Sequence, residues 1–172
     1  MRPSQRPLYT ANEIANRVAR IAKQIDKDYG ADHPVVLPIL KGGFIFAADL
    51  VRRLTVPVAI DFVRARSYSG ALSRGTVELL VLPTTPLAGR RVLLIEDILD
   101  TGRTTASIVD RLRLEGPSDI RICALLDKPM RRAAQVEPDY VGFQIADQFV
   151  VGYGLDYDEQ YRELPAIYTL DD

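Results

Sequence analysis

The feature that most constrains this fold is the apolar run Arg91-Val-Leu-Leu-Ile-Glu-Asp97 near the middle of the chain. Its apolar residues are consecutive rather than alternating, which is typical of a strand that is covered on both faces in a parallel sheet. A helix is expected soon after it, at residues 104–115, where apolar side chains recur at helical spacing until Gly116-Pro117 ends the pattern. A buried strand that leads directly into a helix predicts an α/β fold.

The rest of the chain shows the same alternation of strand and helix. A helix is expected to begin at the capping box Thr10-Ala-Asn-Glu13 and to end at Tyr29-Gly30. Further elements are expected as strands at residues 35–40, 56–66, 77–82, 120–126 and 140–146 and as a helix at residues 44–54. This order predicts an open, largely parallel sheet, and a length of 172 residues fits one domain. Such sheets bind ligands beyond the carboxyl ends of their strands.

Composition narrows the functional class. Hydrophobic residues make up 47% of the chain and charged residues 26%, and the formal net charge of −1 gives no field that would attract nucleic acid or an acidic membrane. Residues 1–9 contain no apolar run, so no signal peptide is expected, and no segment of the sequence approaches a membrane span. The single cysteine, Cys123, lies in an expected buried strand and suits a reducing compartment. We therefore expect a cytoplasmic protein that binds neither nucleic acid nor a membrane.

Dense polar chemistry follows the central strand. Glu96 and Asp97 are adjacent carboxylates, and Asp100 comes shortly after them. The run Thr101-Gly-Arg-Thr104 then opens a helix, where unpaired amides and the positive end of the helix dipole favour a phosphate. The adjacent carboxylates suit instead a diol, or a Mg²⁺ ion shared with substrate oxygens. A phosphate site beside a diol or metal site indicates that the ligand is a sugar phosphate.

A simpler interpretation of this motif is a solvated acidic turn before a well-capped helix. We favour a binding site because the carboxylates, the glycine turn, the hydroxyls and the helix start occur in this order behind a buried strand. Other phosphate motifs are incomplete. Residues 70–76 have the spacing of a P-loop but lack its lysine, and Gly152-Tyr-Gly154 lacks the third glycine of a dinucleotide fingerprint.

The segment Ile95-Glu-Asp-Ile-Leu-Asp-Thr-Gly-Arg-Thr104 resembles the loop of type I phosphoribosyltransferases that binds PRPP (phosphoribosyl pyrophosphate). Three further stretches resemble the hypoxanthine-guanine branch: Leu40-Lys-Gly-Gly-Phe44, Leu125-Leu-Asp-Lys-Pro129, and Phe149 to Tyr157 continuing to Tyr161-Arg162. The resemblance extends from about Tyr9 to the end of the chain. It implies an open, mainly parallel twisted sheet with helices on both faces. It also implies a mobile hairpin loop at about residues 66–76 and a small hood formed by the N-terminal segment and about residues 147–172.

The resemblance also assigns roles within the central motif. It implies that Glu96 and Asp97 hold the ribose hydroxyls and that Asp100 is the acid–base residue beside the purine N7. The nucleotide-binding segment that it implies comprises Glu96, Asp97, Ile98, Leu99, Asp100, Thr101, Gly102, Arg103 and Thr104, of which residues 101–104 hold the 5′-phosphate. Family members vary at the position of Arg103, so its side chain is expected to contribute little beyond charge.

Three later residues are candidates for a base pocket. An ammonium group has only donors, so Lys128, which follows a strand end, suits the 6-oxo group of a purine. Phe149 offers a flat face for stacking, and the backbone of Val150 offers an amide and a carbonyl to the edge of a base. Considered alone, a lysine like Lys128 is more often a solvated surface residue, and an aromatic residue like Phe149 is more often part of the core. Only the family pattern places these residues in a pocket.

Pyrophosphate requires hydrogen-bond donors and positive charge. Lys41-Gly42-Gly43 offers amides with little steric cover directly after a strand, as in an anion nest, and Arg162 can bind a phosphate through two nitrogens. The resemblance implies a cis peptide bond between Leu40 and Lys41. It also implies that Asp156 binds a second Mg²⁺ ion, although Asp156 alone could be a turn residue. The expected cofactor is Mg²⁺, and its expected ligands are Glu96, Asp97 and Asp156.

These expectations combine into one reaction, the transfer of the 5-phosphoribosyl group of PRPP to N9 of hypoxanthine or guanine. Ser67-Tyr68 would lie on a loop that closes over the site and excludes water. Cationic groups and Mg²⁺ would stabilise the leaving pyrophosphate, and Asp100 would manage the N7 proton. The alternatives are a transferase for xanthine, adenine or uracil, and a regulator that keeps the fold but binds RNA through a basic surface. A homodimer or homotetramer is expected from the resemblance.

Overall fold

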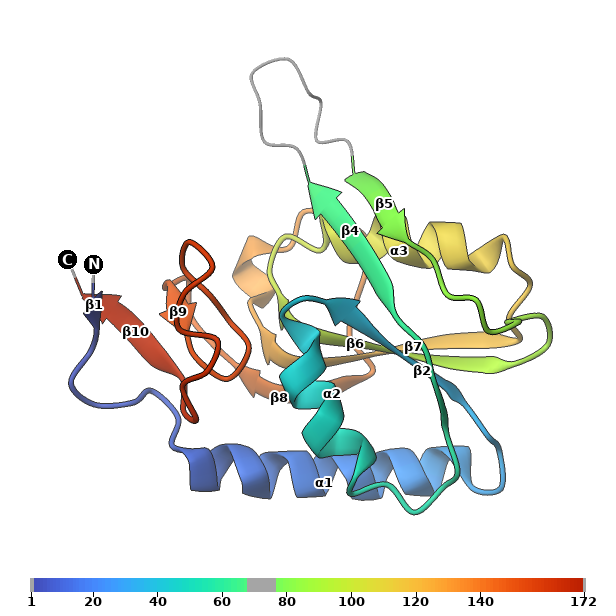
Figure 1. Cartoon of the computed structure of the whole chain (residues 1–172), viewed down its shortest axis with the longest axis horizontal. Coiled ribbons are helices and arrows are strands. Elements are labelled where there is room, and N and C mark those ends of the chain that lie inside the picture. The colour runs from blue at the N-terminus through green and yellow to red at the C-terminus, as the bar shows by residue number, and fades with distance from the viewer. Residues whose placement is uncertain (1, 68–76, 172) are drawn as a thin grey trace.

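A seven-stranded sheet runs through the centre of the molecule (Figure 1). The computed structural model describes residues 2–67 and 77–171. The strands of the sheet are β2 (Val35–Leu40), β3 (Ala59–Ile60), β4 (Val63–Ser67), β5 (Val77–Val81), β6 (Arg91–Leu99), β7 (Asp119–Asp127) and β8 (Tyr140–Gln144). Their order is β5-β4-β2-β6-β7-β8, with β3 beside β2, and every pairing except that of β4 with β5 is parallel. The predicted open, mainly parallel sheet is confirmed.

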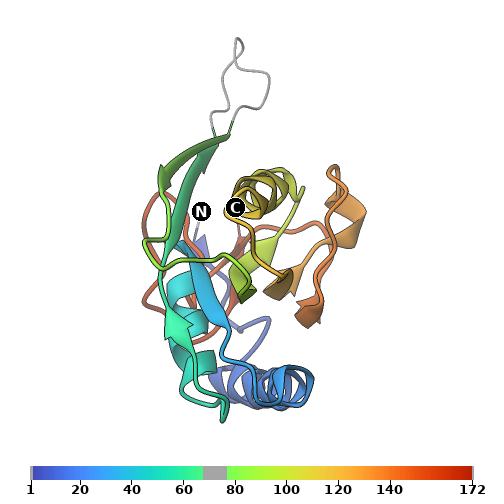
Figure 2. The same cartoon turned by 90° about the vertical axis from the view of Figure 1, so that its right-hand side faces the viewer.

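Helices cover both faces of this sheet, as predicted. Helices α1 (Ala11–Tyr29) and α2 (Gly43–Val51) lie on one face and α3 (Arg103–Arg113) on the other (Figure 2). Successive residues of a strand point to opposite faces. The consecutive apolar residues of β6 therefore serve two cores: Leu93 and Ile95 pack with α1 and α2, whereas Val92 and Leu94 pack with α3. This is why β6 has an unbroken apolar sequence.

The first helix forms where its capping box predicted it. The hydroxyl of Thr10 accepts a hydrogen bond from the N–H of Glu13 at 3.3 Å, and the Glu13 carboxylate accepts one from the N–H of Thr10 at 2.8 Å. Helix α1 ends before Gly30, whose φ of 56° is unfavourable for residues with a Cβ atom. Both ends are therefore set by local sequence.

Several expected boundaries were wrong, and side-chain hydrogen bonds explain two of the larger differences. Asp61 divides the strand expected at residues 56–66 into β3 and β4, because its carboxylate accepts bonds from the N–H groups of Phe62, Thr84 and Thr85. Helix α2 ends at Val51 rather than at residue 54, and the N–H groups of residues 55 and 56 are bound by the Asp26 carboxylate. Strand β6 is longer than expected and continues to Leu99, paired with β7.

The two ends of the chain form a separate small sheet, which confirms the expected hood. Its strands are β1 (Arg2–Pro3), β10 (Tyr168–Asp171) and β9 (Val150–Val151), in that order and all antiparallel. Figure 1 shows this sheet beside the carboxyl ends of the central strands, with the two chain ends next to each other. Strands β4 and β5 form the arms of the expected hairpin, with Ser67 opposite Val77, and residues 68–76 between them lie outside the described residues.

None of the helices in the described part of the chain has the length and apolar character needed to cross a bilayer.

The central strands create a crevice between β2 and β6. The chain leaves β2 through α2 toward β3 and β4, whereas it leaves β6 through α3 toward β7, on the opposite side and opposite face of the sheet. Such a reversal leaves an opening beyond the carboxyl ends of the two strands, where α/β sheets bind their ligands. The expected site segments begin at this point, with Lys41 after β2 and Asp100 after β6.

Candidate active site

Three segments that are distant in sequence meet at the crevice between β2 and β6. The two strands pair only as far as Pro38 with Ile95, so beyond that point Asp97 faces the turn after β2. A Cβ atom on Gly42 would overlap the carboxylate of Asp97, and one on Gly154 would overlap the carbonyl oxygen of Gly42. Glycine is therefore required at both positions for this close approach. The contacts bring the acidic pair, the expected anion nest and the C-terminal turn into one site.

The acidic pair is partly removed from water, Glu96 more so than Asp97. Glu96 is 8% exposed, and one of its carboxylate oxygens accepts a hydrogen bond from the hydroxyl of Thr105 at 3.0 Å. Burial raises the pKa of Glu96 well above its usual range, and the neighbouring charge of Asp97 raises it further. Burial also raises the pKa of Asp97, although hydrogen bonds from Glu96 and Ile98 oppose this effect. A cation or hydroxyl donors at this site would offset the loss of hydration.

Beside this pair is a hollow of about 190 Å³ at the start of α3, lined by Glu96, Asp97, Ile98, Asp100, Thr101, Gly102, Thr104 and Thr105. Gly102 precedes the helix with a φ of 76°, and its carbonyl accepts the first helical hydrogen bond, from Ala106. The N–H groups of Thr101 and Gly102 meet no acceptor within the part of the chain that the structure describes. Free amides and two hydroxyls at a helix start form a suitable site for a phosphate.

Four charged side chains form a second cluster next to this hollow. The carboxylate of Asp100 lies 3.1 Å from Nε of Arg131 and 3.8 Å from the ammonium of Lys128. Asp147 lies 3.1 Å from Arg131 and 3.7 Å from the same ammonium. The Lys128 side chain is only 8% exposed, so its direction is well defined. Its ammonium is thus held close to the candidate acid–base carboxylate.

Phe149 and Val150 stand at the edge of the hood. The Phe149 ring is 55% exposed and makes an edge-to-face contact with Tyr157, at 5.7 Å between ring centroids. An exposed ring face of this kind is available for stacking against a planar ligand. Val150 is buried in β9, where it pairs with Thr169 of β10.

A cluster of opposite charges occupies the remaining side of the crevice. The Lys41 ammonium lies 2.8 Å from the carboxylate of Glu159, and Arg162 lies 2.8 Å from Asp156 and 3.6 Å from Glu159. Arg162 also donates to the carbonyl of Gly154 at 2.7 Å, while its buried Nε has no partner in the described residues. The Leu40–Lys41 peptide bond is cis, which confirms that expectation. Two cations, and a buried donor that has no partner among the described residues, therefore lie on this side of the site.

Similarity to known proteins agrees with this geometry. Residues 4–158 match the family model described as "Phosphoribosyl transferase domain". The chain is 41% identical over 167 residues to the hypoxanthine-guanine phosphoribosyltransferase of Aquifex aeolicus, covering 96% of this chain and 94% of that protein. A crystal structure of a hypoxanthine phosphoribosyltransferase from Staphylococcus aureus is similar with a TM-score of 0.93 and 42% identity, over 97% of this chain and 91% of that one. The chain belongs to the hypoxanthine-guanine phosphoribosyltransferase family.

A third protein similar to this chain is a hypoxanthine phosphoribosyl transferase from Trypanosoma cruzi. Its structure is similar with a TM-score of 0.92 and 36% identity, over 99% of this chain and 93% of that one. The similarity to each of the three relatives covers nearly the whole chain.

The carboxylates of this phosphoribosyltransferase fit Mg²⁺ as a weakly chelated ion. No group of three or more His, Cys, Asp or Glu side chains that could hold a metal occurs within residues 2–67 and 77–171. Thus Glu96, Asp97 and Asp156 do not form one cage, and Asp156 is engaged by Arg162. Mg²⁺ usually keeps several waters and binds through one or two carboxylates together with substrate phosphates. A partly buried carboxylate pair beside the hollow at the start of α3 suits that mode of binding.

Most of the predicted site residues of this phosphoribosyltransferase lie at the crevice, and four differ from the rest in burial or position. The Leu99 side chain is fully buried against α3, so only its backbone is near the hollow. Arg103 is exposed at the first turn of α3. Ser67 ends β4, and Tyr68 lies outside the described residues.

Sequence reasoning missed several charged residues that the fold brings to the site: Asp127, Arg131, Arg132, Asp147 and Glu159. Asp127 had a signal, because it lies within the Leu125-Leu-Asp-Lys-Pro129 stretch. Each of the other four has at least one partner that is distant in sequence; Lys41 and Glu159, for example, are 118 positions apart.

Proposed function

We propose that this protein transfers the 5-phosphoribosyl group of PRPP to N9 of hypoxanthine or guanine, giving IMP or GMP and pyrophosphate. The observation that carries the proposal is the convergence of three binding functions on one crevice. A hollow with free amides at the start of α3 adjoins the Glu96-Asp97 carboxyls and the Lys128-Asp100 pair. A phosphate, a ribose diol and an oxopurine can thus be bound next to one another, as the substrates and products require.

The proposed phosphate and ribose sites follow from the donors and acceptors present. The amides of residues 101–104 and the hydroxyls of Thr101 and Thr104 would bind the 5′-phosphate. The carboxylates of Glu96 and Asp97 would accept hydrogen bonds from the two ribose hydroxyls. Their desolvation supports this role, because hydroxyl donors would replace the hydration that the folded chain removes.

The proposed base site lies between the charged cluster and the hood. Lys128 would donate to O6 of the purine, and the Phe149 ring would stack on the base, with the Val150 backbone at its edge. Asp100 would accept a hydrogen bond from N7–H or take its proton as N9 forms its bond to C1 of the ribose. The 3.8 Å separation of Lys128 and Asp100 supports this arrangement, since O6 and N7 are neighbours on one edge of the purine.

The proposed pyrophosphate site comprises Lys41, Gly42, Gly43 and Arg162. The unpaired Nε of Arg162 and the two cations support it, because pyrophosphate would supply acceptors to all of them. Bound Mg²⁺ would supply positive charge that stabilises the oxygens of the departing pyrophosphate. We propose that Glu96, Asp97 and Asp156 contribute its protein oxygens, directly or through water.

The test is the release of pyrophosphate from PRPP and Mg²⁺ in the presence of each of five bases: hypoxanthine, guanine, xanthine, adenine and uracil. Rapid release with hypoxanthine or guanine, and little with adenine or uracil, is the expected result. Preference for xanthine would establish the alternative of a xanthine transferase. That alternative is open because xanthine, like hypoxanthine and guanine, carries a 6-oxo group. No release with any base, while the protein binds RNA, would refute the enzymatic function.

We further propose that residues 1–172 act as one phosphoribosyltransferase domain in the cytoplasm, on small molecules rather than on nucleic acid or membranes. A homodimer or homotetramer is proposed as well. In the T. cruzi relative, the C-terminal region has a role in the oligomeric state and the enzymatic activity. Light scattering during size-exclusion chromatography tests this proposal, and a monomer at micromolar concentration with full activity would contradict it.

A further inference from the structure

The segment after β7 binds the backbone of the loop between β6 and α3 from behind. We call residues 99–102 the phosphate loop and residues 128–136 the supporting segment. Three consecutive carbonyl groups of the phosphate loop accept hydrogen bonds from the supporting segment. The Leu99 carbonyl accepts from the N–H of Lys128 and from the Arg132 side chain, which also donates to the Asp100 carbonyl. The Thr101 carbonyl accepts from the N–H groups of Ala133 and Ala134. The backbone donors of this set lie 2.9–3.1 Å from their acceptors.

These carbonyl bonds determine where the amides of the phosphate loop point. In a planar trans peptide the C=O of one residue and the N–H of the next point in opposite directions. Since the carbonyls of residues 99–101 are directed to the supporting segment, the amides of residues 100–102 are directed away from it. They face the side of the hollow, where Thr101 and Gly102 have no acceptor among the residues that the structure describes.

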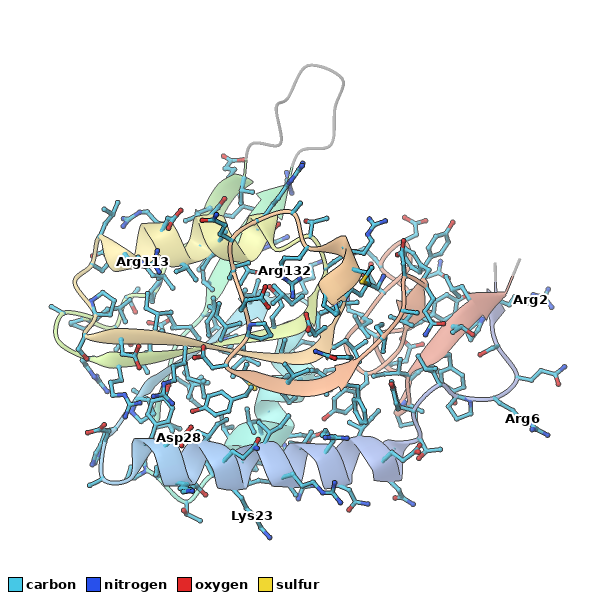
Figure 3. All side chains as sticks on the ribbon, turned by 180° about the vertical axis from the view of Figure 1, so that it is seen from behind. Arg2, Arg6, Lys23, Asp28, Arg113 and Arg132 are labelled. Carbon is cyan, nitrogen blue, oxygen red and sulfur yellow. The ribbon has the colours of Figure 1, made fainter. Side chains whose placement is uncertain are left out.

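Arg132 is the side chain that connects the two segments. Its guanidinium donates to the carbonyls of Leu99 and Val136, each at 3.0 Å, and also to the carbonyl of Asp100 and the carboxylate of Asp127. The side chains of Arg132 and Asp127 are only 8% and 3% exposed. Figure 3 shows Arg132 on the loop after β7, near the N-terminal end of α3. Arg132 is not among the residues that line the hollow.

The contacts around Gly102 also place the supporting segment directly behind the phosphate loop. Gly102 has a φ of 76°, and a Cβ atom there would lie 3.0 Å from Cδ of Arg132 and would overlap the side chain of Val136. The stem of Arg132 and the supporting segment thus form a wall behind the loop. If that wall moved, the carbonyls of the loop would lose their donors and could rotate toward the hollow, where they would repel a phosphate.

We propose that Arg132, held in place by Asp127, is a positioning residue that keeps the amides of the phosphate loop directed at the 5′-phosphate. The inference rests on the proposed function, because it specifies how that phosphate site is built. The charge of Arg132 is balanced by Asp127, so its role is geometric. A lysine would keep the charge but could not replace the fork of donors that reaches four acceptors at once.

The experiment compares Arg132→Lys and Asp127→Asn with the native protein and with Arg113→Lys. Arg113 is a matched control because it is 68% exposed and lies at the far end of α3 (Figure 3). In both test variants the KM for PRPP and the Kd for IMP should rise about tenfold or more, since buried acceptors lose their donors. The KM for hypoxanthine should change less than twofold, and kcat should fall less than the KM for PRPP rises. Arg113→Lys should behave like the native protein.

Native values of the KM for PRPP and the Kd for IMP in folded test variants would overturn the inference, as would equal losses for PRPP and hypoxanthine. If the variants do not fold, amide hydrogen exchange of the native protein decides. Binding of IMP should slow exchange at Ala133 and Ala134, which donate to the phosphate loop, and unchanged exchange there would also overturn the inference. A native protein that binds IMP but transfers no phosphoribosyl group would instead refute the proposed function.

Discussion

Oδ1 of Asp100 lies 3.1 Å from Nε of Arg131, so the proposed acid–base carboxylate forms an ion pair. Arg131 also contacts Asp147 at 3.1 Å, and the Lys128 ammonium is placed close to both carboxylates. The alternation of two cations and two anions restrains each side chain more than a single exposed pair would. A base entering beside Phe149 would therefore meet an oriented carboxylate and an oriented ammonium.

The substitution Asp100→Asn tests the acid–base role. It preserves size and hydrogen bonding but removes the carboxylate, so kcat should fall by about 10²–10⁴-fold, the usual effect of losing a general acid–base group. The KM for PRPP should stay near the native value, because Glu96, Asp97 and the phosphate loop are unchanged. Steady-state kinetics with hypoxanthine measures both, with Asp110→Asn, an exposed residue of α3, as the control. Parallel losses in turnover and PRPP binding would mean that Asp100 positions the ribose instead.

Lys128 should set the preference for a 6-oxopurine. Adenine carries an amino group at position 6, so two donors would face each other, and adenine should be used about 10⁴-fold less efficiently than hypoxanthine. In Lys128→Gln this gap should narrow, since an amide can present either its oxygen or its nitrogen. Values of kcat/KM for hypoxanthine, guanine and adenine in both proteins give the comparison. The assignment fails if adenine is a good native substrate or if the variant keeps the native preference.

Glu159 should compete with pyrophosphate for the same cations. Its carboxylate lies 2.8 Å from Lys41 and 3.6 Å from Arg162, and the hydrogen bond from Lys41 lowers the pKa of Glu159. In Glu159→Gln this competitor is neutral, so the affinity for Mg²⁺-pyrophosphate should rise about two- to fivefold, the scale of an exposed ion pair. Titration calorimetry measures it, with the neighbouring Asp158→Asn as the control. Weaker binding in Glu159→Gln would show that Glu159 holds the cations in place for pyrophosphate.

Asp61 should stabilise the fold in a pH-dependent way. Partial burial alone would raise its pKa, but hydrogen bonds from Thr85, Phe62 and Thr84 lower the pKa of Asp61 to about 2. A lowered pKa gives stability that is present above the unfolded value of about 3.9 and is lost as the pH falls toward 2. Asp61→Asn should therefore reduce the free energy of unfolding by about 1 kcal/mol at pH 7, after allowance for solvent screening.

Urea unfolding of the native and Asp61→Asn proteins at several pH values checks this expectation. The difference between them should stay constant from pH 7 to pH 5 and shrink toward pH 3. A difference that is independent of pH throughout would mean that the charge of Asp61 does not contribute.

Local sequence patterns predicted the parts of the fold that depend on neighbouring residues. The capping box at Thr10 and the unbroken apolar run of β6 each specify one element through residues next to each other in the chain. The break at Asp61 could not be predicted in this way, because the donors at Thr84 and Thr85 come from a distant loop. Propensity alone treats residues 56–66 as one strand.

In the site, too, features set by neighbouring residues could be predicted, and features set by distant residues could not. The carboxylates and the phosphate loop follow one strand directly and were predictable from a single stretch of sequence. The supporting role of Arg132 was not, since its acceptors at Leu99 and Asp100 lie 33 and 32 positions away. An arginine in a loop after a strand ordinarily indicates a solvated residue, and only the tertiary structure reveals that this one is buried.

The pairing of the two chain ends has a practical consequence for work with this protein. Val150 pairs with Thr169, and β10 in turn pairs with β1, so the backbone proposed to meet the base is two hydrogen-bonded strands away from residue 2. An affinity tag fused without a spacer before Arg2 or after Asp171 would be attached directly to β1 or β10 and would disturb the pairing of these short strands. Purified protein carrying such a tag should show an altered KM for the base. A flexible spacer, or insertion of the tag at the turn around Gly116 on the opposite end of the sheet, should avoid this artefact.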